Sequence, residues 1–296
     1  MIGIVVLNYR SWDLSLRCIK SIAKYPPKEE YQIYLVDNDS PNSPEYNLEQ
    51  VIKDYSLKYV KTKKNLGYNG GNNVGIKAAL EDGCDAILYT NNDIVFEKDS
   101  IQFLKDELDD QKKIGITCPK IKDEQGEIQK CHMMHELTMI DKYRITTKLN
   151  LIFRKAYRNY YGLDLSYEEP FYPYAAQGSC VMMSRHCALE VTPFDEVPFL
   201  YEEELMLGHR MKEKGYRELY CPKAIVRHLH GGSTKHVKAF AFAHMVRSEI
   251  YYCKEYLHAK DWMIRPLVWY RSCVYWLKGL RDKDFREGKY RAIINS

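Results

Sequence analysis

Short apolar runs alternate with helical patterns along the first ninety residues, and this alternation limits the chain to few folds. Residues 2–7, 31–36, 57–61 and 86–90 are short and apolar, as strands are. Helical periodicity fills the intervals, at residues 14–22, 48–55 and 74–81. Strands that alternate with helices at this spacing form βαβ units, so the sequence predicts an α/β fold built on a parallel sheet.

Polar residues stand where three of these predicted strands end. Asp37 follows the second strand, a Gly- and Asn-rich segment at residues 65–73 follows the third, and Asn91-Asn92-Asp93 follows the fourth. In parallel sheets, ligands bind outside the carboxyl ends of the strands. We therefore expect these three segments to meet at one edge of the sheet and to form the ligand site.

The first two segments suit a nucleotide. A carboxylate at the position of Asp37 can accept a hydrogen bond from a base N–H or a ribose hydroxyl, although Asp also caps helices and forms Asx turns. Residues 65–73 are predicted to form a turn in which glycines allow positive φ, ahead of a helix whose N-terminus favours phosphate or ribose oxygens. This segment does not fit the GxGxxG pattern, which weighs against a dinucleotide.

The third segment and a later acidic run suit metal-assisted and acid–base chemistry. Asn91 and Asp93 are expected on one side of the chain, where their oxygens can hold a hard divalent cation; a plain turn explains the same residues equally well. Glu202-Glu203-Glu204 has apolar residues on both sides. We therefore expect at least one of these carboxylates to face a cavity as a general base, with a solvated acidic surface as the alternative.

Histidines offer candidates of unequal weight. His228 and His230 alternate after a predicted strand at residues 224–226, so either can ligate a metal, with a structural histidine as the alternative. Cys131, His132 and His135 lie close in sequence, but no second pair at a suitable spacing completes a zinc site.

The cysteines and the hydropathy of the chain indicate the cellular compartment in which we expect it. The nine cysteines include no CxxC pair, and the first residues lack the features of a signal peptide. No apolar run approaches the ~20 residues that cross a bilayer. We therefore expect reduced thiols in a cytoplasmic protein.

Positive charge gathers at the C-terminus. Residues 235–296 hold 13 Lys and Arg against six Asp and Glu, a net charge of +7 in a chain whose total is +4. The rest of the chain therefore sums to −3, which argues against a nucleic acid partner, as does the lack of a recognisable binding motif.

The final sixty residues have a helical pattern that we expect to break at Pro266. Trp262, Trp269 and Trp276 are spaced by seven residues within it. A core or a dimer interface is the favoured explanation for this stripe, and contact with a membrane is the alternative.

The motifs occur in a characteristic order. They are Val6-Leu7-Asn8-Tyr9, Val36-Asp37-Asn38-Asp39-Ser40, residues 65–75, Asn91-Asn92-Asp93, Gly178-Ser179, residues 199–204 and residues 228–234. Together they resemble the inverting glycosyltransferases of family 2, and most of all the rhamnosyltransferase and galactofuranosyltransferase branch. The resemblance covers about residues 1–235.

The resemblance implies a GT-A nucleotide-sugar fold, which is a Rossmann-like, mixed but mainly parallel sheet flanked by helices. It implies a glycosyltransferase domain at residues 1–235 and a basic, aromatic helical extension at residues 236–296. Asp37 would contact the base of the donor. The other residues that the resemblance places at the nucleotide-sugar are Asn8, Asn38, Asn65, Gly67, Asn73, Asn91 and Asn92.

The resemblance also assigns the metal and the base. Asn91-x-Asp93 occupies the position of the family's Asp-x-Asp motif, which makes Asp93 the principal ligand of Mg²⁺ or Mn²⁺. His228 matches a late histidine near the metal. Glu204 is the implied catalytic base, and Glu203 is the reserve.

The reaction implied is transfer of a sugar from a nucleotide-diphosphate donor, of the dTDP-rhamnose or UDP-galactofuranose class, to a hydroxyl of a glycan. The acceptor in this branch is commonly a lipid-linked precursor of a bacterial surface polysaccharide. The metal neutralises the leaving diphosphate while a carboxylate deprotonates the acceptor, and this single displacement inverts the anomeric centre.

Two further expectations concern partners. The basic, aromatic extension suits peripheral contact with the anionic inner face of the cell membrane, and a homodimer through the C-terminal helices is the alternative. A non-catalytic nucleotide-sugar or glycan-binding protein is the competing interpretation of the whole chain, because Asn91 stands where the metal motif has its first acid.

Overall fold

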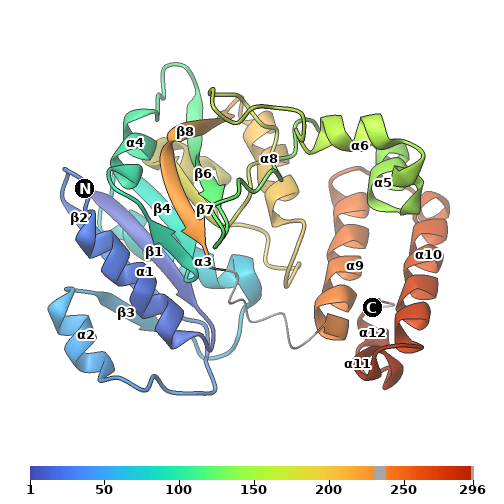
Figure 1. Cartoon of the computed structure of the whole chain (residues 1–296), viewed down its shortest axis with the longest axis horizontal. Helices are drawn as coiled ribbons and strands as arrows, with labels where there is room; N and C mark the ends of the chain where they lie inside the picture. The colour runs from blue at the N-terminus through green and yellow to red at the C-terminus, as the bar shows by residue number, and fades with distance from the viewer. Residues whose placement is uncertain (230–237, 295–296) are drawn as a thin grey trace.

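A computed structural model describes residues 1–229 and 238–294. Figure 1 shows a sheet with its covering helices on one side of the molecule and a separate group of helices on the other. The strands of the sheet are β1 (Ile2–Asn8), β2 (Tyr31–Asp37), β3 (Lys58–Lys61), β4 (Ala86–Asn91), β5 (Ile94–Phe96), β6 (Ile114–Lys122), β7 (Cys180–Ser184) and β8 (Arg217–His228).

The sheet is mixed and mainly parallel, as predicted. Its strand order is β3-β2-β1-β4-β7-β6-β8-β5. Strands β3, β2, β1 and β4 run parallel to one another, and so do β6 and β8; β7 is antiparallel to both of its neighbours, and β5 is antiparallel to β8. In this register Asn8 stands opposite Asp37, and Leu7 stands opposite Asn91, so the predicted strand ends do meet at one edge.

Both faces of the sheet are covered by helices, which explains the continuous apolar strands in the sequence. Ile4 and Val5 of β1 point to opposite faces, and each joins a different core. One face packs against α1 (Trp12–Lys24) and α4 (Ser100–Asp106), and the other packs against α3 (Gly67–Glu81), α7 (Arg185–Val191) and α8 (Glu203–Glu213). A short helix, α2 (Leu48–Asp54), precedes β3.

Helix α3 begins at Gly67, so the predicted turn at residues 65–73 is largely helical and that prediction is wrong. The glycines serve close packing in place of turn formation. A Cβ atom at Gly71 would lie 2.5 Å from Leu7 Cδ1, and one at Gly75 would lie 2.3 Å from Val5 Cγ1. Within this segment Gly67 is the residue with positive φ, +76°. Glycines, which are typical of turns, here allow α3 to lie directly on β1.

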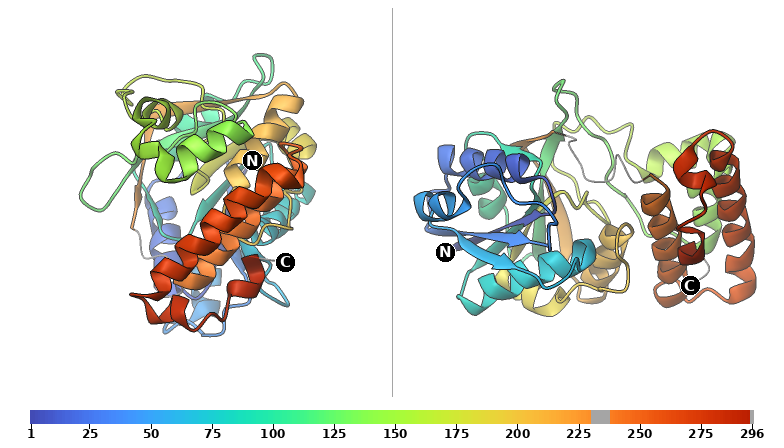
Figure 2. Two further views of the ribbon diagram at one scale, coloured as in Figure 1. Left: turned by 90° about the vertical axis from the view of Figure 1, so that its right-hand side faces the viewer. Right: turned by 90° about the horizontal axis from the view of Figure 1, so that it is seen from below.

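The remaining helices form what we call the helical lobe (Figure 2). It combines the C-terminal helices with an earlier segment, because Met139 packs against Cys253, Ile264 and Leu267. The predicted division at residue 235 remains a prediction, but residues 139–160 lie with the C-terminal helices. The helices of the lobe are α5 (Met139–Thr146), η1 (Lys148–Leu151), α6 (Arg154–Tyr160), α9 (Lys238–Glu255), α10 (Asp261–Gly279), α11 (Lys283–Arg286) and α12 (Arg291–Ile294).

Helix α10 continues through Pro266, so the predicted break is wrong. Pro266 lies on the exposed side of the helix near its start, where water can satisfy the carbonyl that proline cannot bond. Trp262, Trp269 and Trp276 are 69%, 71% and 60% exposed, so they are no part of the core. None of the described helices is both long and apolar enough for a bilayer crossing.

Candidate active site

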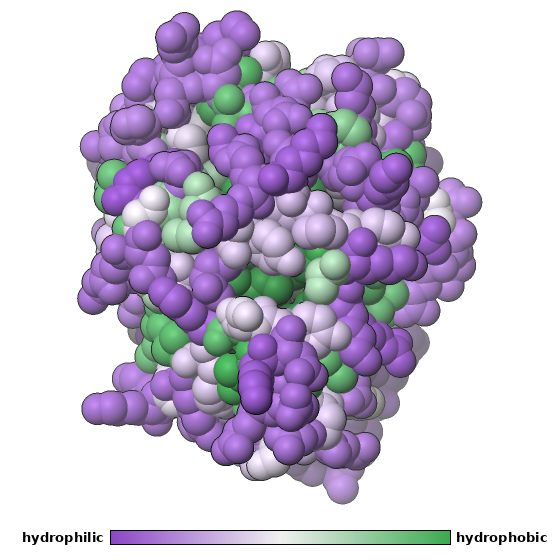
Figure 3. Space-filling view, turned by 90° about the vertical axis from the view of Figure 1, so that its left-hand side faces the viewer, coloured by the Kyte–Doolittle hydropathy of each residue, from purple (hydrophilic) through white to green (hydrophobic). Residues whose placement is uncertain are grey.

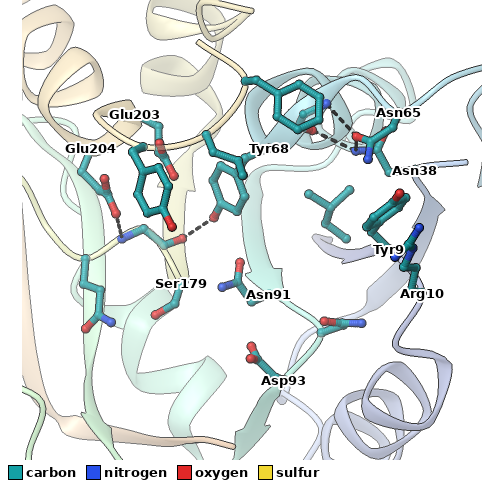
Figure 4. Close-up of a pocket in the computed structure, with 18 of the residues that line it drawn as sticks. Tyr9, Arg10, Asn38, Asn65, Tyr68, Asn91, Asp93, Ser179, Glu203 and Glu204 are labelled. Carbon is teal, nitrogen blue, oxygen red and sulfur yellow. Dashed lines mark hydrogen bonds between the residues drawn. The ribbon is translucent and has the colours of Figure 1, made fainter. Parts of the chain in front are cut away.

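A cavity of about 600 Å³ opens at the carboxyl ends of β1 and β4, between the sheet and the helical lobe. Figure 4 shows that residues from widely separated parts of the chain line it. The predicted site residues in its wall are Asn38, Asn65, Gly67, Asn91, Asn92, Asp93, Glu203, Glu204 and His228.

Asn92 is held in the cavity wall by a hydrogen-bond network behind it. Its Nδ2 donates to Asn8 Oδ1 at 3.0 Å, to Ser11 O at 3.0 Å and to Ser15 Oγ at 2.9 Å. Asn8 is fully buried and in turn donates to Ser40 Oγ at 3.2 Å. The structure therefore places Asn8 behind the wall, where it orients Asn92.

Asn38 fixes the start of α3 at the cavity. Its Nδ2 donates to Asn65 Oδ1 at 3.1 Å and to Gly67 O at 2.9 Å, and its Oδ1 accepts from Leu66 N at 3.0 Å. Gly67 is required here twice over, because its φ is +76° and a Cβ atom would lie 2.5 Å from Phe199 O. This arrangement brings backbone close to the space in which a ligand would lie.

Asp37 and Asn73 lie outside the cavity wall. Asp37 is 1% exposed; its Oδ1 accepts from Ser40 N at 3.0 Å, and its Oδ2 accepts from Tyr59 Oη at 3.3 Å. Asn73 donates to Phe194 O and accepts from Phe194 N, at 2.9 and 2.7 Å. Both side chains thus hold neighbouring loops, and their contact with a donor remains a prediction.

Asp93 and His228 form one end of the cavity. His228 Nε2 lies 3.2 Å from Asp93 Oδ1, because β5 pairs with the end of β8. Asp93 Oδ1 is buried and accepts no well-aligned hydrogen bond from the described residues, and the same is true of Ser179 Oγ nearby in the wall. A buried carboxylate oxygen that accepts no well-aligned hydrogen bond and lies beside an imidazole is a suitable ligand for a hard cation.

The described residues contain no group of three or more His, Cys, Asp and Glu side chains that could hold a metal. A cation at Asp93 and His228 would therefore take further ligands from substrate or water, as Mg²⁺ commonly does. His230, the second candidate from the sequence, lies outside the described residues.

Glu203 and Glu204 stand at another wall of the cavity, in the first turn of α8. The turn before this helix is unusual, because Tyr201 and Glu202 both have positive φ, at +72° and +65°. Gly178 N donates to Glu204 Oε1 at 3.2 Å, and Tyr68 Oη donates to Gly178 O at 2.6 Å (Figure 4). The loop at Gly178 and the acidic residues therefore support each other.

Burial raises the pKa of both carboxyl groups above the usual value for Glu. The rise is larger for Glu203, because the nearby charge of Glu204 adds to the effect of burial. Backbone N–H groups, that of Gly178 among them, counteract burial at Glu204 and favour its ionised form. Backbone N–H groups also counteract burial at Glu203, so the charge of Glu204 is the cause that distinguishes Glu203 and favours its protonated form.

Several wall residues were missed by the sequence interpretation. Tyr68 lies within the Gly/Asn segment but was read as part of a turn, and Arg10, with φ of +68°, follows a strand without an obvious motif. Phe240 and Tyr290 come from the helical lobe. No local pattern could have placed these last two at the end of a distant sheet.

Comparison with known families decides the membership of the chain. The model of glycosyl transferase family 2 matches residues 3–169, which is more than half of the chain. The chain belongs to glycosyltransferase family 2. The predicted family and the predicted GT-A-like fold class are thereby confirmed.

Two curated relatives of this family-2 chain are named as a hexosyltransferase and as a rhamnosyltransferase. The low-salt glycan biosynthesis hexosyltransferase Agl10 of Haloferax volcanii is 24% identical over 221 residues, which cover 74% of this chain and 64% of the relative. The N-acetylglucosaminyl-diphospho-decaprenol L-rhamnosyltransferase of Mycobacterium tuberculosis is 32% identical over 92 residues, which cover 31% of this chain and 29% of the relative. The chain thus spans less than two thirds of the length of either relative.

Solved structures share the fold at low identity. GalNAc-T7, crystallised with UDP, GalNAc and Mn²⁺, has a TM-score of 0.58 and 17% identity over 91% of this chain and 56% of its own. Residues 1–349 of TarS from S. aureus, in complex with UDP-GlcNAc, have a TM-score of 0.54 and 16% identity over 86% of this chain and 66% of their own. At this identity the likeness shows the fold alone.

Proposed function

We propose that this family-2 chain is an inverting, metal-dependent hexosyltransferase that moves a sugar from a nucleotide-diphosphate donor to a hydroxyl of a glycan acceptor. One observation carries the proposal: a single cavity has Asp93 and His228 in one part of its wall and the acids Glu203 and Glu204 in another. A direct displacement needs the leaving group and the general base on opposite sides of the reacting carbon.

Asp93 and His228 would hold Mg²⁺ or Mn²⁺. The buried Asp93 Oδ1, which lies beside His228 Nε2 and accepts no well-aligned hydrogen bond from the described residues, supports this role, as does the presence of Mn²⁺ in the GalNAc-T7 crystals. When bound, the cation supplies charge neutralisation for the leaving diphosphate. Asn91 and Asn92 lie beside it in the wall and are proposed to orient the donor.

Glu204 is the proposed general base. A base must be ionised before it can accept a proton, and the N–H groups around Glu204 favour its ionised form. Glu203, whose pKa is raised by the charge of Glu204 as well as by burial, is better suited to donate a hydrogen bond to the acceptor. The raised pKa of both carboxyl groups supports proton transfer near neutral pH.

The donor is proposed to be of the dTDP-rhamnose or UDP-galactofuranose class, as the resemblance of the motifs implies. The backbone around Gly67 and the side chains of Asn38 and Asn65 line the side of the cavity near β2, which suits the nucleotide. Asp37 is proposed to act at the base from the adjoining strand end, and Asn8 and Asn73 are proposed to position this part of the site.

The acceptor is proposed to be a lipid-linked precursor of a bacterial surface polysaccharide. The name of the mycobacterial relative, which includes a decaprenol diphosphate, supports this class. The net charge of +7 in residues 235–296 supports a cytoplasmic protein that lies peripherally on the inner face of the membrane. A homodimer through the C-terminal helices is the alternative use of that surface.

The test is release of nucleotide from UDP-, dTDP- and GDP-sugars in the presence of lipid-linked acceptors, with Mn²⁺, Mg²⁺ or EDTA. We expect one donor to be used, and we expect turnover to fall at least about 100-fold with EDTA or in Asp93→Ala. Asp99→Asn, which changes an acid at the helix start after β5, is the control. If calorimetry shows nucleotide binding while no donor is turned over, the chain is a binding protein.

A further inference from the structure

A second cavity of about 600 Å³ lies on the helical lobe, apart from the active-site cavity. It is a groove between α9 and α10 that is also lined by Val197 and Pro198. The segment of Val197 and Pro198 continues into the active site, where Phe199 and Leu200 line the first cavity. Ser248 Oγ of α9 donates to Leu200 O at 2.6 Å and fixes the segment between the two cavities.

The groove is rich in positive charge. Arg247, Lys254 and Arg265 line it, and Asp261 is the acid among its lining residues. Lys254 Nζ lies 3.4 Å from Asp261 Oδ1, and both side chains are largely exposed, so this pair contributes little. Within the described residues neither Arg247 nor Arg265 has an ion-pair partner. Two arginines that face one groove and have no carboxylate as an ion-pair partner in the described part of the chain fit an anion.

The rest of the groove is apolar. Ile250, Ile264 and Val268 line it, and Trp269 stands at its edge, 71% exposed. Trp262 and Trp276, on the same stripe of α10, extend this aromatic surface on either side. The left view of Figure 2 looks at the end of the molecule that lies away from the sheet, and α10 is nearest the viewer there. The opposite end is mostly hydrophilic, with apolar residues in separate small areas (Figure 3).

We propose that the groove binds the phosphate headgroup of an anionic membrane lipid. Arg247 and Arg265 would bind the phosphate, and the exposed tryptophans of α10 would enter the interface beside it, where amphipathic rings are favoured. A free phosphate would use the arginines but not the tryptophans. The occupied groove would hold residues 197–201, and with them the active-site cavity, at the membrane surface.

This inference rests on the peripheral membrane contact proposed above, but not on the transfer reaction. Its test is therefore binding of the full chain, without donor, to vesicles of phosphatidylglycerol and phosphatidylcholine, with pure phosphatidylcholine vesicles for comparison. The double variant Arg247→Gln/Arg265→Gln is compared with Arg154→Gln/Lys155→Gln, which removes the same charge from the exposed surface of α6 in the same lobe. Thermal unfolding checks that both variants fold.

We expect the native chain to bind the anionic vesicles, the groove variant to bind about 10-fold or more weakly, and the α6 variant to change less than about threefold. Millimolar glycerol phosphate should not displace the chain from the vesicles. Equal weakening by both variants would mean diffuse electrostatic attraction and overturn the groove. So would displacement by glycerol phosphate, or no binding at low salt. The nucleotide-release assay would stand unaffected by any of these failures.

Discussion

Buried glutamates occur in both halves of the molecule, but of Glu249 and Glu218 only Glu249, in the helical lobe, has a cationic partner among the described residues. In the helical lobe, Glu249 is 2% exposed and accepts hydrogen bonds from Arg271 Nε and Nη2 at 2.7 and 2.8 Å. In the sheet, Glu218 is 3% exposed; it accepts from Ala176 N at 2.7 Å, and its Oε1 has no partner among the described residues. One acid is neutralised by a cation, and the other is not.

The pKa values follow from this difference. Burial alone would raise the pKa of Glu249, but the hydrogen bonds from Arg271 and the charge of Lys142 outweigh burial and lower it. Burial raises the pKa of Glu218 to about 8. Glu203 and Glu204 lie next to Glu218 around one small void and are raised in the same direction. Acids without a cationic partner in the described part of the chain therefore gather at the candidate site, whereas Glu249 is paired with Arg271 inside the lobe.

One ion pair joins the two halves. Lys142 Nζ of α5 lies 2.6 Å from Glu202 Oε2, and Glu202 directly precedes the helix that begins with Glu203 and Glu204. Lys142 is 1% exposed and also lies over the ring of Tyr252. The lobe thus fixes the residue from which the candidate catalytic helix starts.

The largest expected effect tests the unpaired acids. Glu204→Gln keeps the shape of the side chain but cannot accept a proton, so we expect turnover to fall by about 10²–10⁴-fold. Glu203→Gln should cost less, because its carboxyl group is proposed to stay protonated. Glu213→Gln, an exposed acid at the far end of α8, should leave turnover unchanged. A larger loss in Glu203→Gln than in Glu204→Gln would exchange the two roles.

The next effect tests the paired acids. Lys142→Met leaves Glu202, whose side chain is 13% exposed, close to Glu249 without its cation, so we expect about 3–5 kcal/mol of destabilisation in urea unfolding. The double variant Lys142→Met/Glu202→Gln should recover most of that loss. Lys120→Met is the matched control, because its partner Glu168 is 65% exposed and can return to water. Equal costs at Lys142 and Lys120 would show that the internal pair has no special role.

A smaller effect depends on pH. The folded-state pKa of Glu218 is raised to about 8, so the stability that its protonated form contributes is complete below the unfolded pKa, near 4.5. It is lost as the pH rises from there through about 8. Glu218→Gln should therefore flatten the decline of unfolding free energy between these two pH values.

Glu249→Gln provides the opposite case for the same measurement. Its folded-state pKa is lowered, so its contribution is present above the unfolded pKa and is lost as the pH falls through the folded pKa. The native chain should therefore be more stable than Glu249→Gln at neutral pH and should lose that advantage in acid. If the two variants changed the pH dependence in the same direction, the contrast between the halves would be wrong.

The half of the molecule that contains the sheet could be predicted from the sequence, because the patterns that indicate its strands are local. Each strand of the first βαβ units has its own apolar run, and each strand end has its own polar cluster. Parallel pairing then brings the ends of β1, β2 and β4 together without further information. Asp93 is predicted in this way, and Glu203 and Glu204 are predicted from an acidic run with apolar neighbours; all three line the same cavity.

The C-terminal helices were predicted, but the packing of the helical lobe was not, because its contacts join distant parts of the chain. No local pattern shows that Lys142 meets Glu202, or that Phe240 reaches the site. The start of α3 was misplaced for a related reason: Gly71 and Gly75 look like turn residues until β1 is seen against them. The tryptophan stripe has a helical period that is compatible with either face of α10, and only the packing decides between them.

The smallest expected effect checks this last point within two adjacent residues of α10. Trp276 is 60% exposed, and its neighbour Tyr275 is 3% exposed and packs against Phe285. Trp276→Ser should change the unfolding free energy by less than about 0.5 kcal/mol, as substitutions on an open surface do. Tyr275→Ala should cost about 3–5 kcal/mol, because it empties a site inside the lobe. Urea unfolding of both variants provides the measurement. A large loss in Trp276→Ser that depended on protein concentration would show that the stripe is covered by a second copy of the chain, and the membrane-facing assignment of α10 would then give way to a dimer.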